Sequence, residues 1–138
     1  IMCNGSNKEN SECLAEILET ILSLQQVRNE SCDDNTCSRP FLGPSNNIIC
    51  FNTRPLNLYS CCNNVLWRIP FTLNGTSSTS TVFRIENLDD ECATFRVLAT
   101  NPDTTSMFPY VATEDFFTIR LSCIGALKCL GDTNVTGV

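Results

Sequence analysis

The chain has 138 residues, which suits one domain, and nine basic against fifteen acidic residues give it a formal net charge of −6. Proteins that hold nucleic acid usually show a basic patch, and none is visible here, so no nucleic-acid partner is expected. No apolar run approaches the roughly 18 residues of a membrane span, and a charged fraction of only 17% is compatible with close packing between subunits.

The first predicted element is an amphipathic α-helix over about residues 11–28, with Asn10 or Ser11 as its N-cap. Its apolar side chains recur at spacings of three and four, which is the period of one helical face. Two interpretations stay open, a helix docked on the core of its own chain and a helix exchanged between subunits. The predicted stripe consists of Leu14, Ile17, Leu18, Ile21, Leu22 and, more loosely, Gln25.

Beyond the helix the signals are those of short strands separated by turns, one of the turns being predicted at residues 74–80. This spacing predicts a mainly β fold, an antiparallel, jelly-roll-like β-sandwich over residues 39–138, preceded by a cysteine-containing arm over residues 1–38 that carries the helix. The predicted strands are 48–52, 56–60, 65–73, 81–87, 92–100, 115–124 and 127–130.

Alternation of apolar and polar residues within these strands predicts which side chains form the core, because every second residue of a half-buried strand points inward. The predicted core residues are Val82, Phe83, Ile85, Ala93, Phe95, Val97, Ile119 and Leu121.

Ten cysteines are more than an ordinary cytosolic protein carries, which favours crosslinks, metal or both. Structural zinc sites usually take their thiolates from CxxC pairs, and the close pairs here have other spacings, so no metal is expected. If the strand before Cys123 continued, Cys123 and Cys129 would lie roughly 20 Å apart. The chain is therefore expected either to turn at Gly125-Ala126 or to bond these two cysteines elsewhere.

The adjacent Cys61 and Cys62 would point to opposite faces of a strand, so we expect them to have different partners, one of them in another chain. One buried and one exposed thiol is the alternative. For catalysis the chain offers little, since it contains no histidine and no nucleotide-binding or nucleophile motif. The acidic run at residues 89–91 is typical of a solvated turn. No catalytic residue and no cofactor are predicted.

Several segments together resemble one family. Residues 38–43 (SRPFLG) and 52–56 (NTRPL) resemble the PFLG and NTRP segments of spore coat and exosporium proteins of the CotY/CotZ and ExsY type. Residues 83–86 (FRIE) and 89–98 (DDECATFRVL) resemble the family's FRVE and DD.CA..RVL segments. Residues 121–130 (LSCIGALKCL) resemble its C-terminal LSCFCAIQCL, with Gly125 at the position where the family often has a further cysteine.

The resemblance implies a structural protein that is made in the mother cell of an endospore-forming bacterium and deposited in the coat or exosporium. It implies self-assembly into ordered, disulfide-reinforced arrays, with itself and other coat or exosporium proteins as partners. Cys50, Cys61 and Cys62 lie in a segment where no alignment with the family is made, so a different assembly such as a fibre is open. The cysteines that match the family by position are Cys3, Cys13, Cys32, Cys37, Cys92, Cys123 and Cys129.

All ten cysteines are candidate crosslinking residues, and we expect two groups among them. Cys92 and Cys123 border alternating strands and should lie in or beside the core, whereas the four arm cysteines, Cys3, Cys13, Cys32 and Cys37, should reach neighbouring subunits. The main alternative is a secreted, disulfide-stabilised β-sandwich binding module, which needs a cleaved signal peptide and mostly intramolecular bonds. A zinc-thiolate protein and an enzyme are further alternatives.

Overall fold

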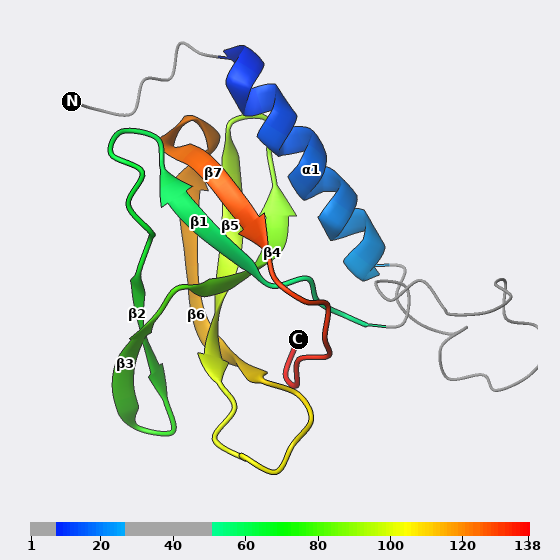
Figure 1. Ribbon diagram of the computed structural model, residues 1–138, viewed down its shortest axis with the longest axis vertical. Helices are drawn as coiled ribbons and strands as arrows, with labels where there is room; N and C mark the ends of the chain where they lie inside the picture. Colours follow the sequence, from blue (N-terminus) through cyan, green and yellow to red (C-terminus); the bar gives the residue numbers. More distant parts are fainter. Residues whose placement is uncertain (1–7, 27–50) are drawn as a thin grey trace, which may run out of the picture.

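The computed structural model describes residues 8–26 and 51–138. One N-terminal helix precedes two antiparallel sheets, so the predicted mainly β class with one N-terminal amphipathic helix is confirmed (Figure 1). The predicted boundary between arm and β domain at residues 38 and 39 lies outside the described residues and stays a prediction. The elements are α1 (Lys8–Gln26), β1 (Leu56–Ser60), β2 (Ile69–Leu73), β3 (Thr76–Ser80), β4 (Val82–Leu88), β5 (Cys92–Thr100), β6 (Tyr110–Arg120), the 3₁₀-helix η2 (Leu121–Cys123) and β7 (Ile124–Cys129).

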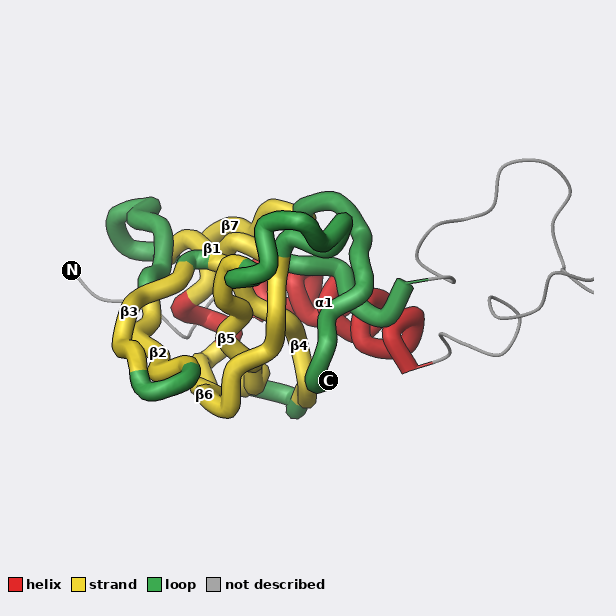
Figure 2. Tube along the Cα trace, turned by 90° about the horizontal axis from the view of Figure 1, so that it is seen from below, coloured by secondary structure: helices red, strands yellow, loops and turns green. Residues whose placement is uncertain are grey.

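The larger sheet has the strand order β6-β5-β4-β1-β7, and β2 and β3 form a separate two-stranded sheet. Because only η2 separates β6 from β7, Arg120 and Ile124 can lie at most roughly 14 Å apart. The two edges of a flat five-stranded sheet would be roughly 19 Å apart. The sheet is therefore curled until its edges converge at η2, and the β2–β3 hairpin lies beside β6 (Figure 2).

The concave face of this curled sheet holds the core. The rings of Phe83 and Phe117 meet edge to face at a centroid distance of 4.8 Å, and Phe95 stacks on Phe117 at 5.5 Å. Of the predicted core residues, all are buried except Val82, which is half-buried. Aromatic contacts of this kind add about 0.5–1.5 kcal/mol each beyond the area they bury.

Helix α1 closes one side of the same core (Figure 1). Leu18 is 0% exposed and Ile21 1%, whereas Ile17, also predicted for the stripe, is 39% exposed. The Gln25 side chain donates from Nε2 to the Ile85 carbonyl at 3.0 Å and accepts from the Arg54 N–H at 3.1 Å. In this structure the helix is docked on its own chain, which answers the first open question.

The outer face of the sheet is polar and is partly covered by the two chain segments next to it. Glu86 accepts from Arg84 at 2.7 Å and from Arg96 at 3.0 Å, and the Arg84 Nε donates to Thr53 Oγ1 at 2.9 Å. Thr53 in turn pairs with Thr133. These contacts hold the C-terminal segment against residues 51–54 and fix the surroundings of Cys129.

Strand boundaries agree with the prediction where the core dictates them and differ elsewhere. The strands predicted at 56–60 and 92–100 are found with those bounds. The predicted turn at residues 74–80 is wrong beyond its first two residues, because Thr76–Ser80 is a strand. Asn74 and Gly75 have φ values of 54° and 79°, which makes a two-residue type I′ turn that returns the chain along β2.

The end of β6 also differs from the prediction. Instead of continuing to residue 124, the strand stops at Arg120 and the chain turns through η2, before Gly125 rather than at it. Cys123 and Cys129 therefore stand at the two ends of β7. An extended strand of that length keeps them roughly 20 Å apart, so they do not bond to each other.

Candidate crosslinking sites

Six of the ten cysteines lie in the part of the chain that the structure describes. Cys3, Cys32, Cys37 and Cys50 lie outside it, so the structure does not place four of the candidate residues. The six are distributed over α1, the turn after β1, β5, η2 and β7, and they differ in exposure. Cys13, Cys61 and Cys129 are exposed, and Cys62, Cys92 and Cys123 are half-buried.

The Cys61–Cys62 doublet follows the end of β1 and lies in a turn, not in a strand. The two Sγ atoms are 3.5 Å apart, on one side of the chain, so the expectation that the side chains point to opposite faces is wrong. The separation exceeds the bond length of about 2.05 Å, so the two sulfurs are not joined to each other. The doublet places two sulfur atoms side by side at the end of β1.

Backbone contacts bring a third cysteine beside this doublet. The Cys61 N–H donates to the Cys123 carbonyl at 3.0 Å, and Ser60 is the register partner of Ile124 at the start of β7. Cys123 itself packs against the hydrophobic core. The end of β1 and the start of β7 thus gather Cys61, Cys62 and Cys123 at one corner of the sheet, two cysteines from one segment and one from another.

Gly125 explains how the two segments come so close. A Cβ atom on this residue would lie 2.6 Å from Cys61 Cα and 2.9 Å from the Ser60 carbonyl oxygen, distances that real Cβ atoms essentially never show. A cysteine at this position, as the family resemblance would place there, would push the backbone of residues 60–61 away. The absence of that cysteine is therefore coupled to the close approach of the doublet.

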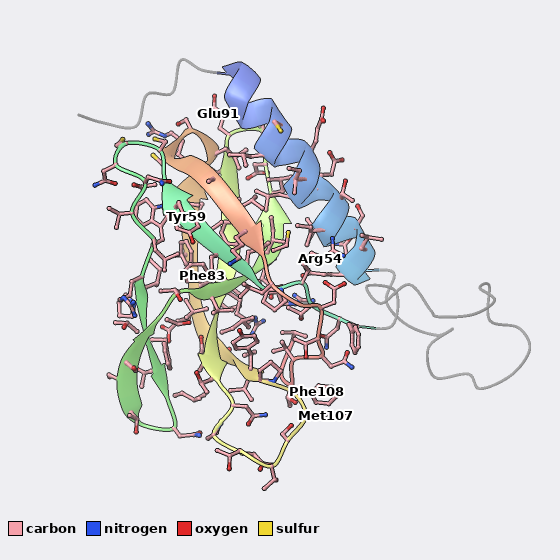
Figure 3. All side chains as sticks on the ribbon, in the orientation of Figure 1. Arg54, Tyr59, Phe83, Glu91, Met107 and Phe108 are labelled. Atoms are coloured by element: carbon pink, nitrogen blue, oxygen red, sulfur yellow. The ribbon has the colours of Figure 1, made fainter. Side chains whose placement is uncertain are left out.

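Cys129 lies at the other end of β7, next to an ion pair. The Arg54 guanidinium donates to both carboxylate oxygens of Asp132, at 2.7 and 3.1 Å, and Figure 3 shows Arg54 near the C-terminal end of α1. Burial of the thiol raises the pKa of Cys129, the Arg54 cation partly offsets this, and the Asp132 carboxylate raises the pKa further. Since the thiolate is the reactive form, we expect Cys129 to react more slowly at neutral pH than a cysteine whose pKa is not raised.

The two remaining cysteines of the described residues lie on the helix and in the sheet. Cys13 is exposed on α1, and Cys92 begins β5 opposite Arg120 of β6. Within the described residues neither these two nor Cys129 takes part in a disulfide. Two exposed thiol positions, Cys13 and Cys129, therefore lie on α1 and at the end of β7.

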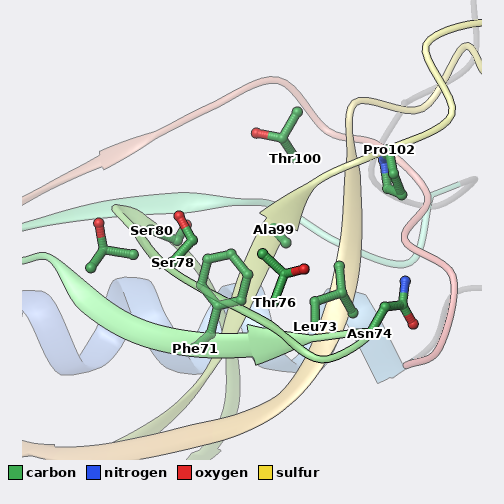
Figure 4. Close-up of a pocket in the computed structure, with 10 residues that line it drawn as sticks. Phe71, Leu73, Asn74, Thr76, Ser78, Ser80, Ala99, Thr100 and Pro102 are labelled. Atoms are coloured by element: carbon green, nitrogen blue, oxygen red, sulfur yellow. The ribbon is translucent and has the colours of Figure 1, made fainter.

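Metal sites, membrane-spanning helices and pockets are the other features that bear on function. Among residues 8–26 and 51–138, no group of three or more cysteine, aspartate or glutamate side chains is arranged to hold a metal ion. No helix within these ranges is long and apolar enough to cross a membrane. A pocket of about 350 Å³ lies between the β2–β3 hairpin and the end of β5 (Figure 4), and its lining carries no charged side chain or thiol. Its lining is Phe71, Leu73, Asn74, Thr76, Ser78, Thr79, Ser80, Ala99, Thr100 and Pro102.

Comparison with known proteins identifies the family. The model of the family "Spore coat protein Z" matches residues 2–108, which is most of the chain and ends in the loop between β5 and β6. No curated protein and no solved structure gives a significant match. The match includes α1 and the strands β1 to β5, so Cys123 and Cys129 lie beyond it. The chain therefore belongs to the spore coat protein Z family and is a structural protein of the spore surface layers.

Proposed function

We propose that this protein is a self-assembling subunit of the spore coat or exosporium, made in the mother cell and joined into ordered arrays or fibres by intermolecular disulfides. The proposal rests on one observation, that the exposed cysteines lie apart from the apolar side chains that form the core. The core is built from apolar side chains of α1 and the sheet, while Cys13 and Cys129 are exposed on two different elements.

The folded core leaves these thiols available for association. A chain of this length can bury about two-thirds of its surface, so it does not depend on disulfides to fold. The described domain buries Leu18, Phe83, Phe95 and their neighbours without a contribution from Cys13 or Cys129. A disulfide between chains then makes association covalent, so that dilution no longer separates the subunits.

The number of intermolecular disulfides that each subunit can form determines which kind of assembly results. One intermolecular disulfide per subunit produces only a dimer, and two or more at separate surface points allow an extended assembly. Two separated positions in the described residues, Cys13 and Cys129, meet this requirement. The same thiols can exchange with other cysteine-bearing coat proteins, which supports the proposed association with such partners.

The alternative of a secreted binding module with mostly intramolecular bonds finds less support. It would need partners within the chain for Cys13, Cys92 and Cys129, and none of these three is bonded among the described residues. Cys123 and Cys129 are also held apart by β7. The arrangement favours bonds between chains.

The test is assembly of the purified full chain. We expect regular oligomers or arrays in electron micrographs and boiling-resistant multimers on a non-reducing gel, the latter lost with reductant. The four-fold variant with serine at residues 3, 13, 32 and 37 should keep its fold and lose the multimers that form through the arm, while those joined through Cys129 remain. A monodisperse monomer by light scattering, at high concentration under oxidising conditions, would contradict the proposed function.

A further inference from the structure

The β2–β3 hairpin presents an exposed strand edge of unusual composition. Strand β3 reads Thr-Ser-Ser-Thr-Ser, and its first four residues are exposed. The hairpin lies at the margin of the domain in Figure 1, and β2 contacts β6. Among the described strands β3 has no hydrogen-bonded neighbour other than β2.

The register shows which backbone groups face outward. The two-residue turn makes Leu73 and Thr76 a hydrogen-bonded pair, and in an antiparallel ladder such pairs alternate with non-hydrogen-bonded pairs. Ser77 and Thr79 therefore direct their N–H and C=O groups away from β2. These two residues supply four hydrogen-bonding groups along the open edge of β3.

The outer edge of β2 offers fewer backbone groups for pairing than the outer edge of β3. Pro70 has no N–H to offer there, and the Thr72 N–H donates to the Asp115 carboxylate of β6 at 2.9 Å. Among the other edge strands, β6 carries Glu114 and Arg120, and β7 carries Lys128. Charged residues and proline are the usual means by which proteins prevent pairing of sheet edges. Of these described edges, β3 alone contains neither.

We propose that β3 pairs antiparallel with β3 of a second copy of this chain, about a two-fold axis at Ser78. This register places Ser78 opposite its own counterpart, Ser77 opposite Thr79 and Thr76 opposite Ser80. Residues with outward groups then face each other, as an antiparallel ladder requires, and four backbone hydrogen bonds form. Every cross-strand pair consists of two hydroxyl side chains, a combination that stabilises pairing.

A second copy is the partner because the edge is complementary to itself. The chain has a net charge of −6, so two copies repel each other. Acidic side chains at the contact would add to this repulsion, and β3 carries none. A two-fold contact alone stops at a dimer. Combined with disulfides at Cys13 or Cys129 on other elements, it extends the assembly, and in this sense the inference rests on the proposed function.

The test measures association of the full chain under reducing conditions, by sedimentation. Thr79→Pro removes an outward N–H, and by symmetry two of the four bonds, without touching the ladder to β2. We expect it to weaken self-association at least roughly tenfold, whereas the matched Thr79→Ala, which keeps the N–H, changes it little. Unchanged melting temperatures would show that both variants are folded.

A charge pair tests the register. Ser78→Lys alone and Ser78→Glu alone should each lose association, because like charges meet at the two-fold axis, and an equimolar mixture should recover it as a mixed dimer. Failure of the mixture to recover, or wild-type strength in Thr79→Pro, would overturn the β3 pairing. If the reduced wild type is monomeric but oxidised protein still forms arrays, the pairing is wrong and the proposed function stands. If no condition gives assembly, both are wrong.

Discussion

The antiparallel pairs β4–β5 and β2–β3 differ in almost every respect except their geometry. In β4 and β5 alternate residues are buried, among them Phe83, Ile85 and Phe95. In β3 every residue is a serine or threonine and the first four are exposed, although its register with β2 is uninterrupted, whereas the register of β4 with β5 shifts once. The first pair forms much of the core, whereas the second adds only partly buried side chains of β2, Ile69 and Phe71, to it. We propose that fold and association use different parts of the chain.

The largest effect should come from a charge in the core. Leu18→Asp would place an unpaired carboxylate at a position that is 0% exposed, at a cost of several kcal/mol. We expect α1 to detach, or the domain to unfold, in thermal melts followed by circular dichroism. Ile17→Asp, on the same helix but 39% exposed, is the control and should be tolerated. Equal stability of the two variants would show that the helix does not dock as described.

The next effect contrasts the two strand pairs directly. Phe95→Ala removes a ring that is 0% exposed and contacts Phe83 and Phe117, and should lower the free energy of unfolding by about 3–5 kcal/mol. Phe71→Ala in β2 removes a half-buried ring and should lower it by only about 1–2 kcal/mol. Urea denaturation in the presence of reductant measures both. Similar losses would mean that the hairpin supports the fold as much as the core does.

A smaller loss is expected at the corner where the doublet meets β7. Gly125→Cys restores the residue type that the family resemblance suggests, but its Cβ meets the backbone of residues 60–61. We expect a destabilisation of about 1–3 kcal/mol from the forced shift. Gly131→Ala is the control, since a Cβ there meets nothing within 4 Å. A fully stable Gly125→Cys protein would argue against the close approach at this corner.

The smallest effect concerns reactivity rather than stability. Asp132→Asn removes a carboxylate that raises the pKa of Cys129 and leaves the Arg54 cation, which lowers it. The pKa of Cys129 should fall, so a larger thiolate fraction is present at neutral pH and alkylation is faster. Mass spectrometry of iodoacetamide labelling against pH follows this residue alone. Asp103→Asn, the same charge change on the loop after β5, should leave the labelling curve of Cys129 in place.

The sequence predicts those parts of the fold in which burial leaves a periodic signal. The bounds of β1 and β5 and the buried Leu18 and Ile21 follow from alternation and helical spacing. Strand β3 has no apolar residue to alternate, so its serines and threonines suggest a turn, and only the Asn74-Gly75 pair signals that a hairpin returns. A two-residue turn of this type could have revealed the strand.

The cysteine sites are predicted less well, for a different reason. Each cysteine is visible in the sequence, but the contact between Cys61 and Cys123 joins residues that are 62 positions apart, and no local pattern reports it. The expectation of opposite faces applies strand geometry to Cys61 and Cys62, although the predicted strand already ends at Ser60. Gly125 is predicted as a turn position and as a missing cysteine, whereas a glycine inside a strand is also a signal of close backbone approach.

The most direct test of the central claim, that the core folds the subunit and the cysteines join subunits, mixes two isotopic forms. Chains labelled with ¹⁴N and ¹⁵N are combined while reduced, oxidised together, and digested without reduction for mass spectrometry. We expect disulfide-linked peptides with one partner of each isotope, including peptides that contain Cys13 or Cys129. Linked peptides of a single isotope only would show that the disulfides lie within chains, and would contradict the account.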